Sequence, residues 1–149
     1  MTGPFALERF VQAQDRGGTY ARAVDELRSG RKTSHWMWFV FPQIVGLGRS
    51  PTAQEFAISS LAEAQAYLAH PVLGPRLVAC AEILTTLSGR SAEEIFGSID
   101  AMKLRSSMTL FARAAPDDAV FGQVLRQYFE GRFDELTDRL LSASGPPGS

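Results

Sequence analysis

Apolar residues recur along most of this chain at the three- and four-residue spacing of an α-helix. The clearest stripe lies within residues 73–87, and its members are Leu73, Leu77, Cys80, Leu84 and Leu87. A helix brings residues at this spacing onto one face, which can be buried against a neighbouring element. Gly89 follows the stripe, and glycine is common at a helix end. The periodicity therefore favours a helical fold over a sheet, in which apolar and polar residues would alternate.

Start and stop signals divide the rest of the chain into further helices. The signals are glycines after the stripes (Gly17-Gly18, Gly30, Gly131), an N-cap followed by proline (Ser50-Pro51), and two pairs with capping-box spacing (Ser60/Glu63, Ser91/Glu94). A long helix is expected from about Ile99 to Arg113. We predict an all-α fold: a compact single-domain bundle of about seven or eight helices, some of them short.

The segment 36–41 differs from the helical stripes because it is a continuous run of aromatic and aliphatic residues, as in a strand. Pro42 also favours extended backbone at Phe41. A single strand without a partner forms no sheet, so we expect this aromatic segment to thread through or beside the helical core. We assign residues 1–141 to the domain, and residues 142–149, which offer no apolar anchor, to a flexible tail.

Charge, hydropathy and cysteine content exclude several classes of protein. The net charge of −1 disfavours nucleic acid as a partner, because few cations are in excess to neutralise phosphates. No apolar run approaches the roughly 18 residues of a transmembrane helix, so we expect no membrane association. The lone cysteine, Cys80, fits a reducing compartment, and the first ten residues do not form a secretory signal. We therefore expect a cytoplasmic protein, of an oligomeric state that the sequence does not indicate.

Residues 31–43 combine cations, a histidine and both tryptophans of the chain. Arg31, Lys32 and His35 come first, followed by the aromatic block and then Gln43. The cations could hold an anionic group, a tryptophan could stack on a base or sugar, and His35 could exchange a proton near neutral pH. The alternative is structural, with the aromatic residues in the core and the cations on a solvated helix end.

A second polar cluster is expected on the helix over residues 99–113. The spacing of Lys103, Ser106, Ser107 and Leu110 favours a common face, which is polar for a core stripe. The alternative is a buried helix whose serines bond to backbone carbonyls and whose lysine extends to water.

Several of these residues belong to longer motifs. The segment reads Lys32-Thr-Ser-His-Trp-Met-Trp-Phe-Val-Phe-Pro-Gln43, followed by Gly46-Leu-Gly-Arg-Ser50. Later motifs are His70-Pro-Val-Leu-Gly-Pro-Arg-Leu77, Glu94-Ile-Phe-Gly97 and Lys103-Leu-Arg-Ser-Ser-Met-Thr-Leu-Phe111. This combination resembles a bacterial family known as domain of unknown function 1810, whose members often carry the label calpastatin. The likeness covers nearly the whole chain apart from the tail.

The resemblance implies a mainly α-helical fold in a cytosolic bacterial protein, and it implies no activity. The chain departs from the family at residues 98–101. The family usually has paired acidic residues there, whereas this chain has Asp100-Ala101. The resemblance therefore implies no role that needs two carboxylates at this position.

Together the two clusters predict a site for a small anionic or nucleotide-like ligand. One wall would be formed by Arg31, Lys32, His35, Trp36, Trp38 and Gln43, and the other by Lys103, Ser106 and Ser107. If the protein is an enzyme, His35 is the candidate acid-base group and Lys103 the candidate anion stabiliser. The sequence specifies no reaction and no cofactor, and its one cysteine and two histidines lack the spacing of a metal site.

The alternative function is a non-catalytic protein-interaction module. Such a module would expose some of Trp36, Trp38 and Phe41 as a contiguous aromatic patch, because aromatic side chains supply much of the binding energy at interfaces. A concave pocket with convergent polar groups would instead favour ligand binding.

Overall fold

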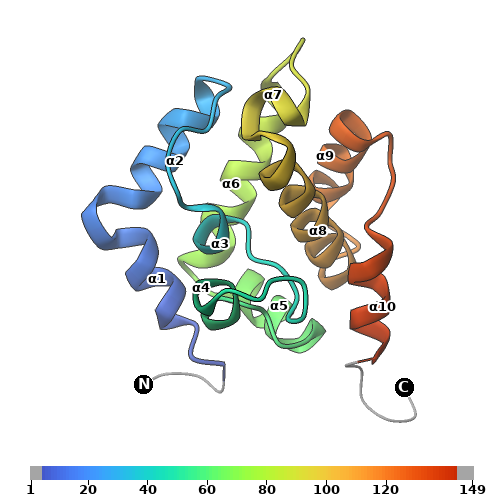
Figure 1. Cartoon of the computed structure of the whole chain (residues 1–149). Helices are drawn as coiled ribbons and strands as arrows, with labels where there is room; N and C mark the ends of the chain where they lie inside the picture. The colour runs from blue at the N-terminus through green and yellow to red at the C-terminus, as the bar shows by residue number, and fades with distance from the viewer. Residues whose placement is uncertain (1–4, 144–149) are drawn as a thin grey trace.

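The computed structural model describes residues 5–143, and the regular structure in this range is helical (Figure 1). The helices are α1 (Glu8–Asp15), α2 (Thr19–Arg28), α3 (Met37–Val40), α4 (Pro51–Glu55), α5 (Leu61–Ala69), α6 (Leu73–Thr86), α7 (Ala92–Phe96), α8 (Ser98–Ala114), α9 (Ala119–Phe129) and α10 (Glu135–Ala143), with a 3-10 turn, η1 (Arg16–Gly18), after α1. Seven of these α-helices have eight residues or more, and α3, α4 and α7 have five or fewer. For the described range, the predicted all-α bundle with some short helices is confirmed.

Between residues 5 and 143, β pairing is limited to a single parallel bridge between Ile44 and Ile58. The Val45 N–H donates to the Ile58 carbonyl at 2.8 Å, and the Ile58 N–H donates to the Gln43 carbonyl at 2.8 Å. The bridge ties the chain that follows the aromatic segment to the residues just before α5.

Helix α8 is the longest helix of the bundle and packs against α5, α7, α9 and α10 (Figure 1). Gly97 joins α7 to α8 with φ of +81°, a conformation that residues with a side chain rarely adopt. Leu104, Met108 and Phe111 are buried, whereas Ile99 and Met102 in its first two turns are exposed. The helix expected from about Ile99 to Arg113 is confirmed, and its start is open to solvent on one side.

The aromatic segment runs through the core, as predicted, but its backbone is not extended. Met37–Val40 form the single helical turn α3, and Phe41 lies just after it. Pro42 is compatible with this helix because it restricts only Phe41, which already has non-helical backbone. The rings of Trp36, Phe41 and Phe96 form a buried cluster with centroids 6.2–6.4 Å apart. This cluster fixes the segment against α7.

The predicted helix starts are confirmed, with one difference in detail. Ser50 accepts from the Ala53 N–H, and Ser91 and Glu94 form a complete capping box. Ser60 also caps its helix, but the Glu63 carboxylate accepts from the Ser59 N–H instead of the Ser60 N–H. The other oxygen of the Glu63 carboxylate pairs with Arg9, 3.0 Å away on α1.

The remaining expectations concern burial and the ends of the chain. Cys80 is buried in the stripe of α6, as its place between Leu77 and Leu84 predicted. Helix α10 includes Ser142 and Ala143, and the rest of the expected tail, residues 144–149, lies outside the described residues. No helix in the described range is both long and apolar enough to cross a membrane.

Candidate functional site

The carboxylate of Glu26 on α2 organises the first part of the predicted segment. It is buried and accepts hydrogen bonds from the N–H of Thr33 (2.8 Å), the N–H of Ser34 (3.0 Å), the Ser34 hydroxyl and the indole N–H of Trp36 (2.9 Å). Burial raises the pKa of this carboxyl group, but the hydrogen bonds outweigh burial and bring the pKa to about 2. Residues 33–36 are therefore folded around one negative charge, which directs Trp36 into the core.

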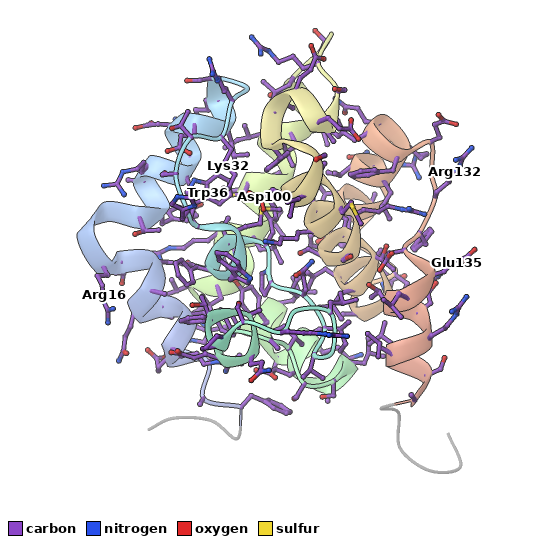
Figure 2. The ribbon with its side chains drawn as sticks, viewed as in Figure 1. Arg16, Lys32, Trp36, Asp100, Arg132 and Glu135 are labelled. Atoms are coloured by element: carbon purple, nitrogen blue, oxygen red, sulfur yellow. The ribbon has the colours of Figure 1, made fainter. Side chains whose placement is uncertain are left out.

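Asp100, in the first turn of α8, links the segment to that helix through charge. Its carboxylate pairs with Nζ of Lys32 at 2.8 Å and with Nζ of Lys103 at 3.4 Å. Figure 2 shows Lys32, Trp36 and Asp100 close together near the middle of the molecule. Nζ of Lys32 also lies 5.2 Å from the centroid of the Trp36 ring. Two cations share one anion here, so the cluster keeps one net positive charge.

Trp38 and Gln43 make the second set of contacts with α8. Nζ of Lys103 lies 4.2 Å from the centroid of the Trp38 ring, within the range of a cation–π interaction. The Gln43 side-chain amide donates to the Lys103 carbonyl at 3.4 Å. Trp38 is partly exposed, whereas Trp36 is buried. The segment thus has a closed side around Trp36 and an open side around Trp38.

A cavity of about 510 Å³ opens beside Trp38 and Lys103. It lies between α8, the start of α10 and residues 47–53, and four residues predicted for the site line it: Trp38, Gln43, Lys103 and Ser106. Its apolar lining comes mainly from Leu47, Ile99, Met102 and Leu136. Ligand-binding pockets for small molecules span roughly 300–1,000 Å³. The cavity therefore has the size and the mixed lining of a small-molecule site.

Most polar groups of the lining already have partners. The Ser106 Oγ lies 3.2 Å from the Met102 carbonyl oxygen and 3.1 Å from the Asp134 carboxylate, so these two acceptors share its one hydrogen. Asp134 also accepts from the Thr137 N–H (3.0 Å) and the Thr137 hydroxyl, which fixes the start of α10 against α8. Arg49 differs, because within residues 5–143 its guanidinium takes part in no ion pair or hydrogen bond. Arg49 is exposed at the lining, so its guanidinium is available to an anion.

The other predicted site residues lie away from this cavity. Arg31 and His35 are exposed, and neither lines the cavity. Lys32 and Trp36 belong to the closed cluster with Asp100 and Glu26. Ser107 is fully buried, and its hydroxyl has no hydrogen-bond partner in the described part of the chain. Ser106 and Ser107 face different surroundings because neighbouring residues on a helix point about 100° apart.

Arg49 and the apolar part of the lining were not among the residues predicted from the sequence. Arg49 belongs to the Gly46–Ser50 motif, which was identified in the sequence. However, nothing in the sequence indicated that its guanidinium would have no partner. Ile99 and Met102 share a helical face with Lys103 and Ser106, a pattern that the sequence did contain. Leu136 could not be found in this way, because only the packing of α10 brings it to the cavity. In the same described range, no group of three or more His, Cys, Asp or Glu residues could hold a metal ion.

Comparisons with known proteins reveal similarity over nearly the whole chain. The family described as "Protein of unknown function (DUF1810)" matches residues 4–141. A crystal structure of the conserved hypothetical protein Rv1873 from Mycobacterium tuberculosis is 54% identical to the chain, with a TM-score of 0.91. The match covers 94% of this chain and 99% of the mycobacterial one. No protein with curated annotation matches.

Proposed function

The chain belongs to the DUF1810 family of proteins of unknown function, as its motifs predicted. Because membership in this family implies no activity, we propose a function from the cavity itself. The protein binds a small organic anion beside Trp38 and Lys103. The proposal retains four of the residues predicted from the sequence and adds Arg49. It leaves His35 outside the site, and it assigns no reaction.

One observation carries the proposal: polar side chains from two distant parts of the chain converge on one cavity. Trp38 and Gln43 come from the aromatic segment, and Lys103 and Ser106 come from α8. An apolar pocket with a few convergent polar groups is the usual form of a ligand site. The Lys103 ammonium is held between Asp100 and the Trp38 ring, so it is ordered before a ligand arrives.

The alternative, a protein-interaction module, is supported less well. Trp36 and Phe41 are buried, so they do not form the exposed aromatic patch with Trp38 that we expected for such a module. The exposed side chains of Ile99 and Met102 are the observation that favours docking of a protein. They also line the cavity, where an organic ligand would cover them equally well.

Thermal unfolding in the presence of nucleotides and organic acids tests the proposal. A ligand at about 100 times its Kd adds roughly 2.7 kcal/mol if it binds only the folded state. For a chain of this size, that gain raises Tm by about 5–10 °C. We expect at least one organic anion to produce such a shift with the parent protein.

Three variants locate the binding. Lys103→Met keeps the length of the side chain and removes its charge, and Arg16→Met is the matched control. Arg16 is exposed, and Figure 2 shows it on the opposite side of the molecule from Glu135 at the start of α10. We expect Lys103→Met to weaken the ligand response, and Arg16→Met and His35→Ala to keep it. Equal responses in all three variants and the parent would refute binding beside Lys103.

A further inference from the structure

Resting on the proposed function, we infer that the cavity takes a monocarboxylate with an apolar hydrocarbon body, in preference to a nucleotide. The inference comes from three features of the lining: its exposed apolar side chains, the Arg49 guanidinium that has no partner among residues 5–143, and the position of Lys103 on the Trp38 ring.

Three large apolar side chains of the lining are exposed to solvent. Ile99 is 70% exposed, Met102 is 71% exposed and Leu136 is 49% exposed. These three account for most of the large exposed apolar side chains in the described part of the chain, and all of them line one cavity. Grouped exposed apolar residues commonly mark a binding surface. A hydrocarbon body would bury these apolar side chains, whereas a sugar or a phosphate chain would offer them little apolar contact.

The charges of the lining match one negative charge. Lys103 shares the Asp100 carboxylate with Lys32, and Asp134 is engaged by Ser106 and Thr137, so the lining cations exceed the lining anion by one charge. Arg49 is then the lining cation whose guanidinium has no partner within residues 5–143. A guanidinium binds a carboxylate through two parallel hydrogen bonds. One such group suits a monoanion, and it would leave most of the charge of a triphosphate unpaired.

One face of the Trp38 ring is closed to a nucleobase. Nζ of Lys103 lies over the ring at 4.2 Å from its centroid, so the ammonium covers one face. Lys103 is also held by Asp100 at 3.4 Å. A base could stack on that face only after both contacts had broken, whereas a hydrocarbon chain can pass along Ile99 and Met102 without displacing Lys103.

Isothermal titration with four probes tests the inference: octanoate, butyrate, octan-1-ol and ATP. Each buried methylene lowers Kd by up to about fourfold, so octanoate should bind at least about tenfold more tightly than butyrate. Octanoate should also bind roughly fivefold more tightly than octan-1-ol, which has the same body without the charge. ATP should bind more weakly than octanoate.

Two variants separate the contributions of charge and body. Arg49→Met should reduce the preference for octanoate over octan-1-ol, with Lys103 still present, and leave the binding of octan-1-ol unchanged. Met102→Ser, at an exposed position that leaves the core intact, should reduce the preference for octanoate over butyrate. Arg16→Met should behave like the parent in every titration.

The outcomes distinguish the inference from the proposed function. If ATP binds beside Lys103 and octanoate does not bind, the inference of a monocarboxylate ligand is wrong, and the proposed binding of an organic anion stands. Equal affinity for octanoate and octan-1-ol would overturn the role of Arg49. If none of the four probes binds and the panel of organic anions also gives no thermal shift, the proposed function fails and the inference fails with it.

Discussion

Replacing Glu26 with Gln should destabilise the protein because this carboxylate holds residues 33–36 in place. The carboxylate accepts four hydrogen bonds, including one from Trp36, and its pKa falls from an ordinary 4.5 to about 2. Each unit of pKa corresponds to about 1.4 kcal/mol, so the ionised form contributes about 3 kcal/mol to folding at neutral pH. Gln keeps the shape and one acceptor oxygen, and it removes the charge.

The pH dependence of this effect has a definite sign. A carboxyl group whose pKa is lower in the folded state stabilises the fold above its unfolded pKa, and the contribution is lost as pH falls towards the folded pKa. The difference in unfolding free energy between the parent and Glu26→Gln should therefore fall from about 3 kcal/mol at pH 7 to about 1 kcal/mol at pH 3.

Urea denaturation followed by circular dichroism at the two pH values measures this difference. Glu94→Gln is the control, because Glu94 also accepts a backbone N–H in a capping box but is exposed. Its loss of stability should be smaller than that of Glu26→Gln. A Glu26→Gln effect of the same size at pH 3 and pH 7, or a Glu94→Gln effect as large, would refute the reasoning.

Three further predictions concern the core. A thiol reagent should modify Cys80 slowly in the native protein and rapidly in urea, because burial raises the pKa of this thiol to about 12; fast native labelling would contradict its burial. Leu77→Ala should cost about 2–5 kcal/mol in urea denaturation, and a loss below about 1 kcal/mol would be inconsistent with a core position. Gly74→Ala should lower the free energy of unfolding by at least about 2 kcal/mol, because a Cβ there would lie 2.0 Å from the Leu68 carbonyl oxygen. The control Gly122→Ala, in α9, should leave the free energy of unfolding unchanged or raise it by up to about 1 kcal/mol. Similar effects for the two variants would contradict the packing at Gly74.

The helices could be predicted because the signals that define them are local. The stripe around Cys80 and the capping box at Ser91 and Glu94 depend on spacing within one helix, and both occur as expected. The core position of the aromatic segment followed from its composition. Its single helical turn did not, because the fold of residues 33–36 depends on Glu26, a charged residue on another helix.

The candidate site could be predicted only in part, because side-chain direction in an irregular segment has no periodicity. The sequence placed Trp36 and Trp38 on one wall, but the bond to Glu26 turns Trp36 inward, and Trp38 lines the cavity. The same limitation applies to His35, which precedes Trp36 and lies outside the lining. Leu136 joins the site through the packing of α10 on α8, a tertiary contact that the sequence alone does not encode in any motif.

The central claim is that an organic anion binds beside Trp38, and the two indole N–H signals in an amide NMR spectrum test it most directly. The chain has two tryptophans, of which Trp38 lines the cavity and Trp36 is buried and bonded to Glu26. On titration with octanoate, and separately with AMP, we predict that at least one probe shifts the Trp38 indole signal together with the backbone amides of Gly48 and Lys103. The Trp36 indole signal should stay in place. Shifts confined to residues around Arg16, or no shift of the Trp38 signal at saturating concentrations of both probes, would contradict the account.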